Sequence, residues 1–269
     1  MKKILFPTDF SETAANAFQY ALQLAERLEG RLDLMTVYHL PINDAGRVPP
    51  DSIERMLQEK KAQAMAKIKS FAEGAPAERI GKVRADYGLF IAQEITDAAR
   101  REEYDLIIMG TKGQHNPLEK VLGSVTTQTL MNAPCPVFAI PQDAAFTEIE
   151  HIAYATDFRP TDEHAVNTLM ELAGELAAQV HFIHIDTKAK IGAMEEEIEL
   201  EEYPFNFTDF TILNKASITD GLDNYMREKH IDLLALFIPR RRLWERLFHT
   251  SFTKKMTFHT RLPLLVFRE

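Results

Sequence analysis

Lys-Ile-Leu-Phe-Pro-Thr-Asp-Phe, residues Lys3–Phe10, recurs as His-Ile-Ala-Tyr-Ala-Thr-Asp-Phe at His151–Phe158. In the first copy the apolar run Ile4–Phe6 ends at a proline, which is typical of a short buried strand in a parallel sheet. The Thr-Asp-Phe triplet is identical in both copies at an offset of 148 residues. The segment therefore predicts two similar units that each begin with a buried strand.

Two further blocks repeat in the same order. Asp105–Met109 (Asp-Leu-Ile-Ile-Met) recurs as Asp232–Leu236 (Asp-Leu-Leu-Ala-Leu), now at an offset of 127 residues. Ala133–Ile140 resembles Arg261–Phe267. Because three blocks recur in order, we predict two homologous domains, of which the second is shorter in its middle.

Strand and helix patterns alternate through the first half of the chain. The predicted strands are Ile4–Phe6, Leu32–Val37, Lys82–Asp86, Leu106–Met109 and Pro136–Ile140. Apolar residues recur at helical spacing between them, and Ser11 is placed to cap the first helix. We therefore predict an α/β fold of two tandem, doubly wound domains, residues 1–143 and 149–269. Each would be a five-stranded parallel sheet with helices on both faces.

A group of glycines follows the fourth predicted strand. Two residues separate Gly110 from Gly113, and nine more separate Gly113 from the pair Gly123-Ser124. Glycines let backbone amides approach a phosphate closely, and a helix N-terminus adds free N–H groups and a positive dipole end. Lys112 would add a charge and Ser124 a hydroxyl. The pattern predicts an anion-binding loop, although glycines that serve only turns and helix caps are an alternative.

The Gly-x2-Gly-x9-Gly-Ser pattern, the opening Ile4–Ser11 and the closing Ala133–Val137 together resemble the universal stress protein family. The whole chain resembles the tandem form of that family. The resemblance implies that the first domain binds an adenine nucleotide, ATP, for which Mg²⁺ is a companion ion. The residues it assigns to the nucleotide are Pro7, Thr8, Asp9, Val37, Met109, Gly110, Lys112, Gly113, Gly123, Ser124, Val125 and Thr126.

The roles within this set differ. The resemblance places Pro7, Thr8 and Asp9 beside the nucleoside, and the backbone of Val37 beside adenine. Met109 and Gly110 would flank the ribose, and the residues from Lys112 to Thr126 in that set would hold the phosphates. Asp9 has an alternative role in turn formation or helix capping.

The second domain departs from the glycine pattern. Phe237–Arg240 replaces Gly110–Gly113, and His249-Thr250 replaces Gly123-Ser124. Bulky side chains would keep a ligand from the backbone, and Pro239 has no N–H to donate. We therefore predict a degenerate second domain and one nucleotide per chain.

Charge in the second domain is polarised. Arg240–Lys255 carries six Lys or Arg and one Glu, whereas Asp186–Asp209 carries eight Asp or Glu and two Lys. Each run fits a solvated surface. Alternatively, the basic run binds an anion or an acidic partner, for which the acidic run competes.

Other candidate sites are weaker. Alternation along a strand places His184 and Asp186 on one face and His181 on the other, so no metal site is expected there. Cys135 lies between two prolines and suits packing better than nucleophilic chemistry. No set of residues with catalytic spacing stands out, so no catalytic residue is predicted.

Composition narrows the classes of function. The chain has 269 residues, of which 45% are hydrophobic and 26% charged, with a net charge of −9 and one cysteine. This balance favours a folded protein and disfavours binding to nucleic acid. No apolar run reaches the roughly 20 residues of a membrane span or forms a signal peptide. We therefore expect a cytoplasmic protein with no membrane partner.

Three functions stay open at this point. The first is a stress-response switch, in which ATP changes the affinity for an unknown protein partner. The second is slow ATP hydrolysis or autophosphorylation at Ser124 or Thr126, for which the sequence shows no general base. The third is a nucleotide-independent scaffold that uses the second domain. The resemblance also implies that Val137–Ile140 and Leu264–Phe267 pair antiparallel as an intramolecular pseudo-dimer, and homodimer formation is left open.

Overall fold

The structure is a computed structural model that describes residues 2–40, 50–111, 122–156, 163–186, 209–214, 218–238 and 262–268. The chain divides into two compact units, Met1–Phe146 and Thr147–Glu269, called unit 1 and unit 2 below. Lys112, Gly113, Pro239, Arg240, His249 and Thr250 lie outside the described residues, as do most of the acidic and basic runs of unit 2.

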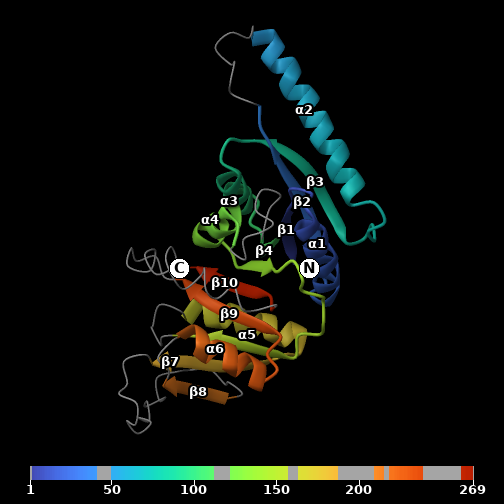
Figure 1. The fold of residues 1–269 in the computed structure, drawn as a ribbon. Helices are drawn as coiled ribbons and strands as arrows, with labels where there is room; N and C mark the ends of the chain where they lie inside the picture. The colour runs from blue at the N-terminus through green and yellow to red at the C-terminus, as the bar shows by residue number, and fades with distance from the viewer. Residues whose placement is uncertain are drawn as a thin grey trace. The chain divides into compact units, whose positions relative to one another are not determined.

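Unit 1 is a five-stranded parallel sheet in the order β3-β2-β1-β4-β5 (Figure 1). Its elements are β1 (Lys3–Pro7), α1 (Glu12–Arg27), β2 (Arg31–Tyr38), α2 (Pro50–Phe71), β3 (Ile80–Tyr87), α3 (Ile91–Arg101), β4 (Leu106–Gly110), α4 (Ser124–Asn132) and β5 (Val137–Ile140). All five strands predicted in the first half are present. The central strands β1 and β4 are apolar because helices cover both faces of the sheet, whereas the edge strand β3 carries Lys82, Arg84 and Asp86.

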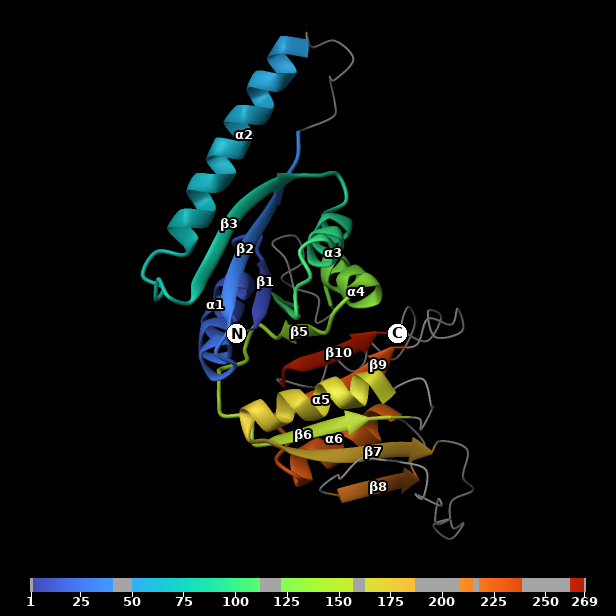
Figure 2. The same ribbon diagram turned by 180° about the vertical axis from the view of Figure 1, so that it is seen from behind.

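The helices of unit 1 form two layers. The Phe6 ring of β1 lies 5.4 Å from Phe18 of α1 and 6.4 Å from Phe71 of α2, so these two helices share one face. Helices α3 and α4 pack together and lie on the other side of the sheet (Figures 1 and 2). Ile4, Leu5 and Phe6 are completely buried between the layers.

Unit 2 has the corresponding parallel order, β10-β9-β6-β7-β8. Its elements are β6 (His151–Ala155), α5 (Glu163–Leu176), β7 (Gln179–Asp186), β8 (Asp209–Asn214), α6 (Ile218–Glu228), β9 (Leu233–Ile238) and β10 (Leu264–Arg268). The predicted fold class, tandem doubly wound α/β domains, is confirmed. The nucleotide-binding role given to residues 1–143 and the degenerate role given to 149–269 stay predictions.

Equivalent backbone hydrogen bonds form within each of the two units. Thr8 N donates to Met35 O (2.9 Å), and Thr156 N donates to Ile183 O (3.1 Å), each shifted by the repeat offset. The left-handed residue that ends α1, Glu29 (φ 48°), has its counterpart after α5 in Ala177 (φ 55°). The repeated segments therefore fold in the same way.

Gly30 follows α1, at a position where a glycine commonly caps the C-terminus of a helix. The left-handed residue after α1 is Glu29, one position earlier. A Cβ on Gly30 would lie 2.8 Å from Ile4 Cδ1 and 3.1 Å from the carbonyl oxygen of Lys2. Close approach to β1 therefore requires a glycine there.

None of the helices in the described ranges is long and apolar enough to cross a membrane. The cytoplasmic location stays a prediction. The expected pairing of Val137–Ile140 with Leu264–Phe267, like homodimer formation, also stays a prediction.

Candidate functional site

The first part of the candidate site is the turn from β1 into α1. Phe10 N donates to Thr8 Oγ1 and Ser11 N donates to Asp9 Oδ1, each with a donor–acceptor distance of 3.0 Å. Ser11 Oγ then accepts from Ala14 N (3.1 Å) and caps α1. Phe10 adopts a left-handed conformation (φ 65°) within this turn. Asp9 thus has the turn role that the sequence left open, and its side chain is exposed at the carboxyl edge of the sheet.

The second part is the junction of β4 with α4. Thr111 N donates to Ile140 O (2.9 Å), and Gly123 N donates to Thr111 O (2.7 Å), which brings Gly123 to the end of β4. Thr126 Oγ1 donates to Gly110 O (3.0 Å), which ties the first turn of α4 to the same strand end. These bonds place Gly110, Gly123 and Thr126 together, as expected for one site.

Helix α4 begins without a side-chain cap, unlike α1. Its N-cap is Gly123, which makes no side-chain hydrogen bond, and Ser124 is exposed. Thr127 N is the first amide to bond within the helix, to Gly123 O (2.9 Å). The amides of Ser124, Val125 and Thr126 find no acceptor in the part of the chain that the structure describes. They therefore suit an oxyanion ligand.

Gly110 has a packing role at the end of β4. A Cβ at this position would lie 3.0 Å from Thr13 Cγ2 and 3.2 Å from the Thr13 carbonyl oxygen. The glycine therefore lets α1 approach the end of β4 closely. A substitution at Gly110 would disturb this packing as well as the predicted ligand site, which makes Gly123 the better test residue.

The remaining predicted residues occupy the ends of neighbouring strands. Pro7 ends β1, Val37 stands one residue before the end of β2, and Met109 precedes Gly110 in β4. Pro7 and Met109 are buried, and Val37 is half-buried. Because parallel strands end at one edge, these three residues and the start of α4 share the edge where ligands bind in such folds.

In unit 2 the counterpart of Gly110 is Phe237, which pairs in register with Phe267 of β10. It is half-buried near the end of β9. An aromatic side chain thus replaces hydrogen at this strand end. The prediction of a single nucleotide per chain rests on this substitution and on others that fall outside the described residues.

Two weaker candidates have packing roles. Burial raises the pKa of the Cys135 thiol to about 12, and the charge of Asp105 acts in the same direction. The thiol is therefore protonated at neutral pH and unsuited to nucleophilic attack. His184 Nδ1 lies 2.8 Å from the carbonyl oxygen of Thr156, so this imidazole is engaged with the backbone.

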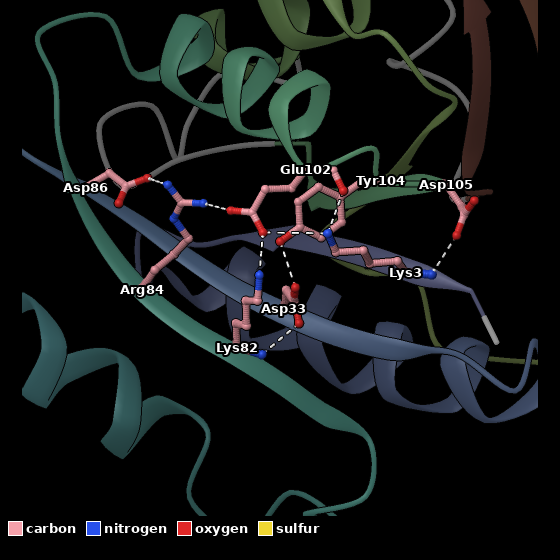
Figure 3. A network of polar contacts seen from close by, with 8 residues as sticks. All are labelled: Lys3, Asp33, Lys82, Arg84, Asp86, Glu102, Tyr104 and Asp105. Atoms are coloured by element: carbon pink, nitrogen blue, oxygen red, sulfur yellow. Dashed lines mark hydrogen bonds and ion pairs between the residues drawn. The ribbon is translucent and has the colours of Figure 1, made fainter.

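A polar cluster extends from the amino-terminal ends of β1 and β2 along β3 as far as Asp86 (Figure 3). It consists of Lys3, Asp33, Lys82, Arg84, Asp86, Glu102, Tyr104 and Asp105. Asp33 is only 5% exposed; its carboxylate accepts from Tyr104 Oη (2.8 Å) and from Lys82 N (2.7 Å). Burial, and then the hydrogen bond to Asp33, raises the pKa of Tyr104 well above its ordinary value, so the phenol remains a donor.

Glu102 is the second centre of the polar cluster. It accepts from Lys82 Nζ (2.8 Å), pairs with Arg84 and lies 3.6 Å from Lys3 Nζ. The hydrogen bond from Lys82 lowers the pKa of Glu102, opposed by burial and assisted by the charges of all three cations. Arg84 also pairs with Asp86. Every ionic group here has a partner within unit 1, so the polar cluster is structural.

Sequence patterns did not reveal the polar cluster. Asp33 is one polar residue within an apolar run, and its partner Tyr104 is 71 residues away. The only available signal was the repeat itself, since Lys3 and Asp33 align with His151 and His181 at the offset of 148.

Comparison with known families agrees with this architecture. The model of the universal stress protein family matches residues 1–141, which is more than half of the chain. The chain belongs to the universal stress protein family.

Two members of the family from Methanocaldococcus jannaschii match one domain's length of the chain. One is 29% identical over 144 residues, covering 52% of this chain and 81% of the relative. The other is 30% identical over 159 residues, covering 52% of this chain and 94% of the relative.

Solved structures of family members match the whole chain. A universal stress protein from Archaeoglobus fulgidus gives a TM-score of 0.65 at 18% identity, covering 99% of this chain and 96% of that one. A second, from Pseudomonas aeruginosa, gives 0.63 at 16% identity, covering 100% and 93%. At these identities the match shows that both halves share the fold of such proteins.

Proposed function

We propose that unit 1 binds ATP at the edge formed by the ends of β1, β2 and β4 and the start of α4. The nucleotide would act as a switch that changes affinity for a protein partner during stress. The observation that carries the proposal is the uncapped start of α4, where Gly123 leaves the amides of Ser124, Val125 and Thr126 for a ligand. The resemblance of the glycine pattern to nucleotide-binding family members selects the adenine nucleotide.

The two helix starts at this edge argue for a ligand at α4. Ser11 caps α1 with its own hydroxyl, whereas α4 has only hydrogen at the equivalent N-cap position. Serine and aspartate stabilise a helix start, whereas glycine offers no acceptor. A phosphate would supply the missing acceptor and interact favourably with the helix dipole. Lys112 and Gly113 belong to this proposal by resemblance alone, as does Mg²⁺.

The autophosphorylation alternative narrows to one hydroxyl. Thr126 is 3% exposed, and its hydroxyl donates to Gly110 O. This hydroxyl therefore stabilises the junction of β4 with α4 and is poorly accessible to a phosphoryl group. Ser124 is exposed at the start of α4 and is the accessible acceptor. A time course with γ-labelled ATP on wild type and Ser124→Ala separates this chemistry from simple binding.

The proposal is tested by giving α4 the side-chain cap that it lacks. Gly123→Asp adds a carboxylate acceptor where the phosphate would bind, so ATP affinity should fall by at least about 10-fold through lost amides and charge repulsion. The melting temperature should stay unchanged or rise, because aspartate caps a helix at least as well as glycine. Isothermal titration and thermal unfolding measure the two effects.

Gly174→Asp is the matched control. Gly174 lies in α5 of unit 2, and a Cβ there meets nothing within 4 Å, so the variant adds the same charge outside the unit that holds the proposed site. It should bind ATP as wild type does. Undiminished ATP binding by Gly123→Asp would contradict the proposed site.

A further inference from the structure

Unit 2 contains a histidine pair that no role above uses. His151 Nδ1 of β6 and His181 Nε2 of β7 lie 3.0 Å apart, and the ring centroids are separated by 5.2 Å. His151 pairs in register with Gln179, so His181, two residues further along β7, projects from the same face of the sheet. His181 is 5% exposed and His151 is half-buried. The sequence pattern compared His181 with His184 and so missed this cross-strand partner.

The pair occupies the place of the polar cluster. His151 and His181 align with Lys3 and Asp33, and Ile231 aligns with Tyr104. The surrounding backbone is the same, since Asp105 Oδ2 accepts from Lys3 N (2.7 Å) and Asp232 Oδ2 accepts from His151 N (2.9 Å). Unit 2 thus replaces ionic partners with two imidazoles that face each other.

The spacing of the ring nitrogens suits a shared metal ion. With metal–nitrogen bonds of about 2.0–2.1 Å, two ligands at a right angle are about 2.9 Å apart, and two tetrahedral ligands about 3.4 Å. The observed 3.0 Å falls within this range. Imidazole nitrogen favours Zn²⁺, Ni²⁺ and Cu²⁺, whereas Mg²⁺ and Ca²⁺ prefer oxygen ligands.

We propose that His151 and His181 bind a divalent transition-metal ion through Nδ1 and Nε2, respectively. Among the described residues, no group of three or more His, Cys, Asp or Glu side chains forms a metal site, so water completes the coordination on the half-buried His151 side. In the metal-free pair one proton lies between the two nitrogens. Binding moves that proton to the other nitrogen of its ring or to solvent, and no electron is transferred.

The backbone around the pair is already fixed, which favours binding. The Asp232 carboxylate accepts from both Glu150 N and His151 N, each at a distance of 2.9 Å, and so holds the start of β6. His181 lies within β7, which pairs with β6 on one side and β8 on the other. Ordering the two ligands in advance lowers the entropy cost of metal binding.

The test is titration of the full, tag-free chain with ZnCl₂, with MgCl₂ as the hard-ion comparison. Wild type should bind one Zn²⁺ per chain with a rise in melting temperature, and Mg²⁺ should give no response. His151→Gln should weaken Zn²⁺ binding by at least about 10-fold, since it removes a ligand. His184→Gln is the matched control, because that imidazole contacts the Thr156 carbonyl, and it should bind Zn²⁺ as wild type does.

A measurement on wild type protects the test against misfolded variants. Long-range ¹H–¹⁵N spectra should show the ring nitrogens of His151 and His181 shifting with Zn²⁺ while those of His184 stay in place. The proposal is overturned if no saturable binding occurs up to about 100 µM Zn²⁺. It is equally overturned if His151→Gln binds Zn²⁺ as tightly as wild type, since the pair is then only a hydrogen bond.

Discussion

Unit 1 and unit 2 have the same strand order and equivalent backbone hydrogen bonds within each unit. They nevertheless differ in the side chains at both ends of their strands. At the carboxyl ends, unit 1 has Gly110 where unit 2 has Phe237. Toward the amino-terminal ends, unit 1 has Asp33 bonded to Tyr104, and unit 2 has His181 beside His151. Backbone pairing fixes the fold in both, so side chains at the strand ends are free to specialise each unit.

The largest stability effect is expected toward the amino-terminal ends of the strands, where unit 1 has Asp33 and unit 2 has His181. Asp33→Ala leaves the Tyr104 hydroxyl and the Lys82 amide without their acceptor, so unit 1 should lose about 3 kcal/mol of unfolding free energy. Urea unfolding followed by circular dichroism measures the loss. Asp97→Ala is the control, because its pair with Arg100 is exposed and should contribute less than about 0.5 kcal/mol. Equal losses in the two variants would show that Asp33 does not anchor unit 1.

Tyr104→Phe removes one hydroxyl and makes unit 1 more like unit 2, where Ile231 occupies this position. The Asp33 carboxylate then loses one of its two donors, which should cost about 1–2 kcal/mol. Tyr87→Phe, on a ring that is 45% exposed, should change stability by less than about 0.5 kcal/mol. Urea unfolding measures both variants. Equal stability of Tyr104→Phe and wild type would show that the Tyr104 hydroxyl does not stabilise unit 1.

The smallest effect is the pH dependence from Glu102, whose counterpart in unit 2 is Lys229. Its pKa is lowered in the folded state, chiefly by Lys82, so the stabilisation is present above the ordinary value of 4.5 and disappears as pH falls below it. Wild type should exceed Glu102→Gln by up to about 1 kcal/mol at pH 7, because Lys82 is largely exposed. The difference should shrink as the pH is lowered below 4.5, and a constant difference would exclude a charge effect.

Much of the fold was predictable because its signals are local. Apolar runs marked the central strands of unit 1, Ser11 marked the start of α1, and the Gly123-Ser124 pair marked the start of α4. The Asp33–Tyr104 bond and the His151–His181 pair were not predictable from spacing, because strand pairing brings together residues far apart in sequence. At the candidate site, Thr126 donates a hydrogen bond to Gly110 O, and Gly110 allows close packing of α1. The glycine spacing alone predicted neither of these structural roles.

We infer that the two units differ in nucleotide binding because their strand ends differ. The most direct measurement is the stoichiometry of ATP binding to the full chain by isothermal titration. We expect one site per chain, in unit 1. Two equivalent sites, or no binding at saturating ATP, would contradict it.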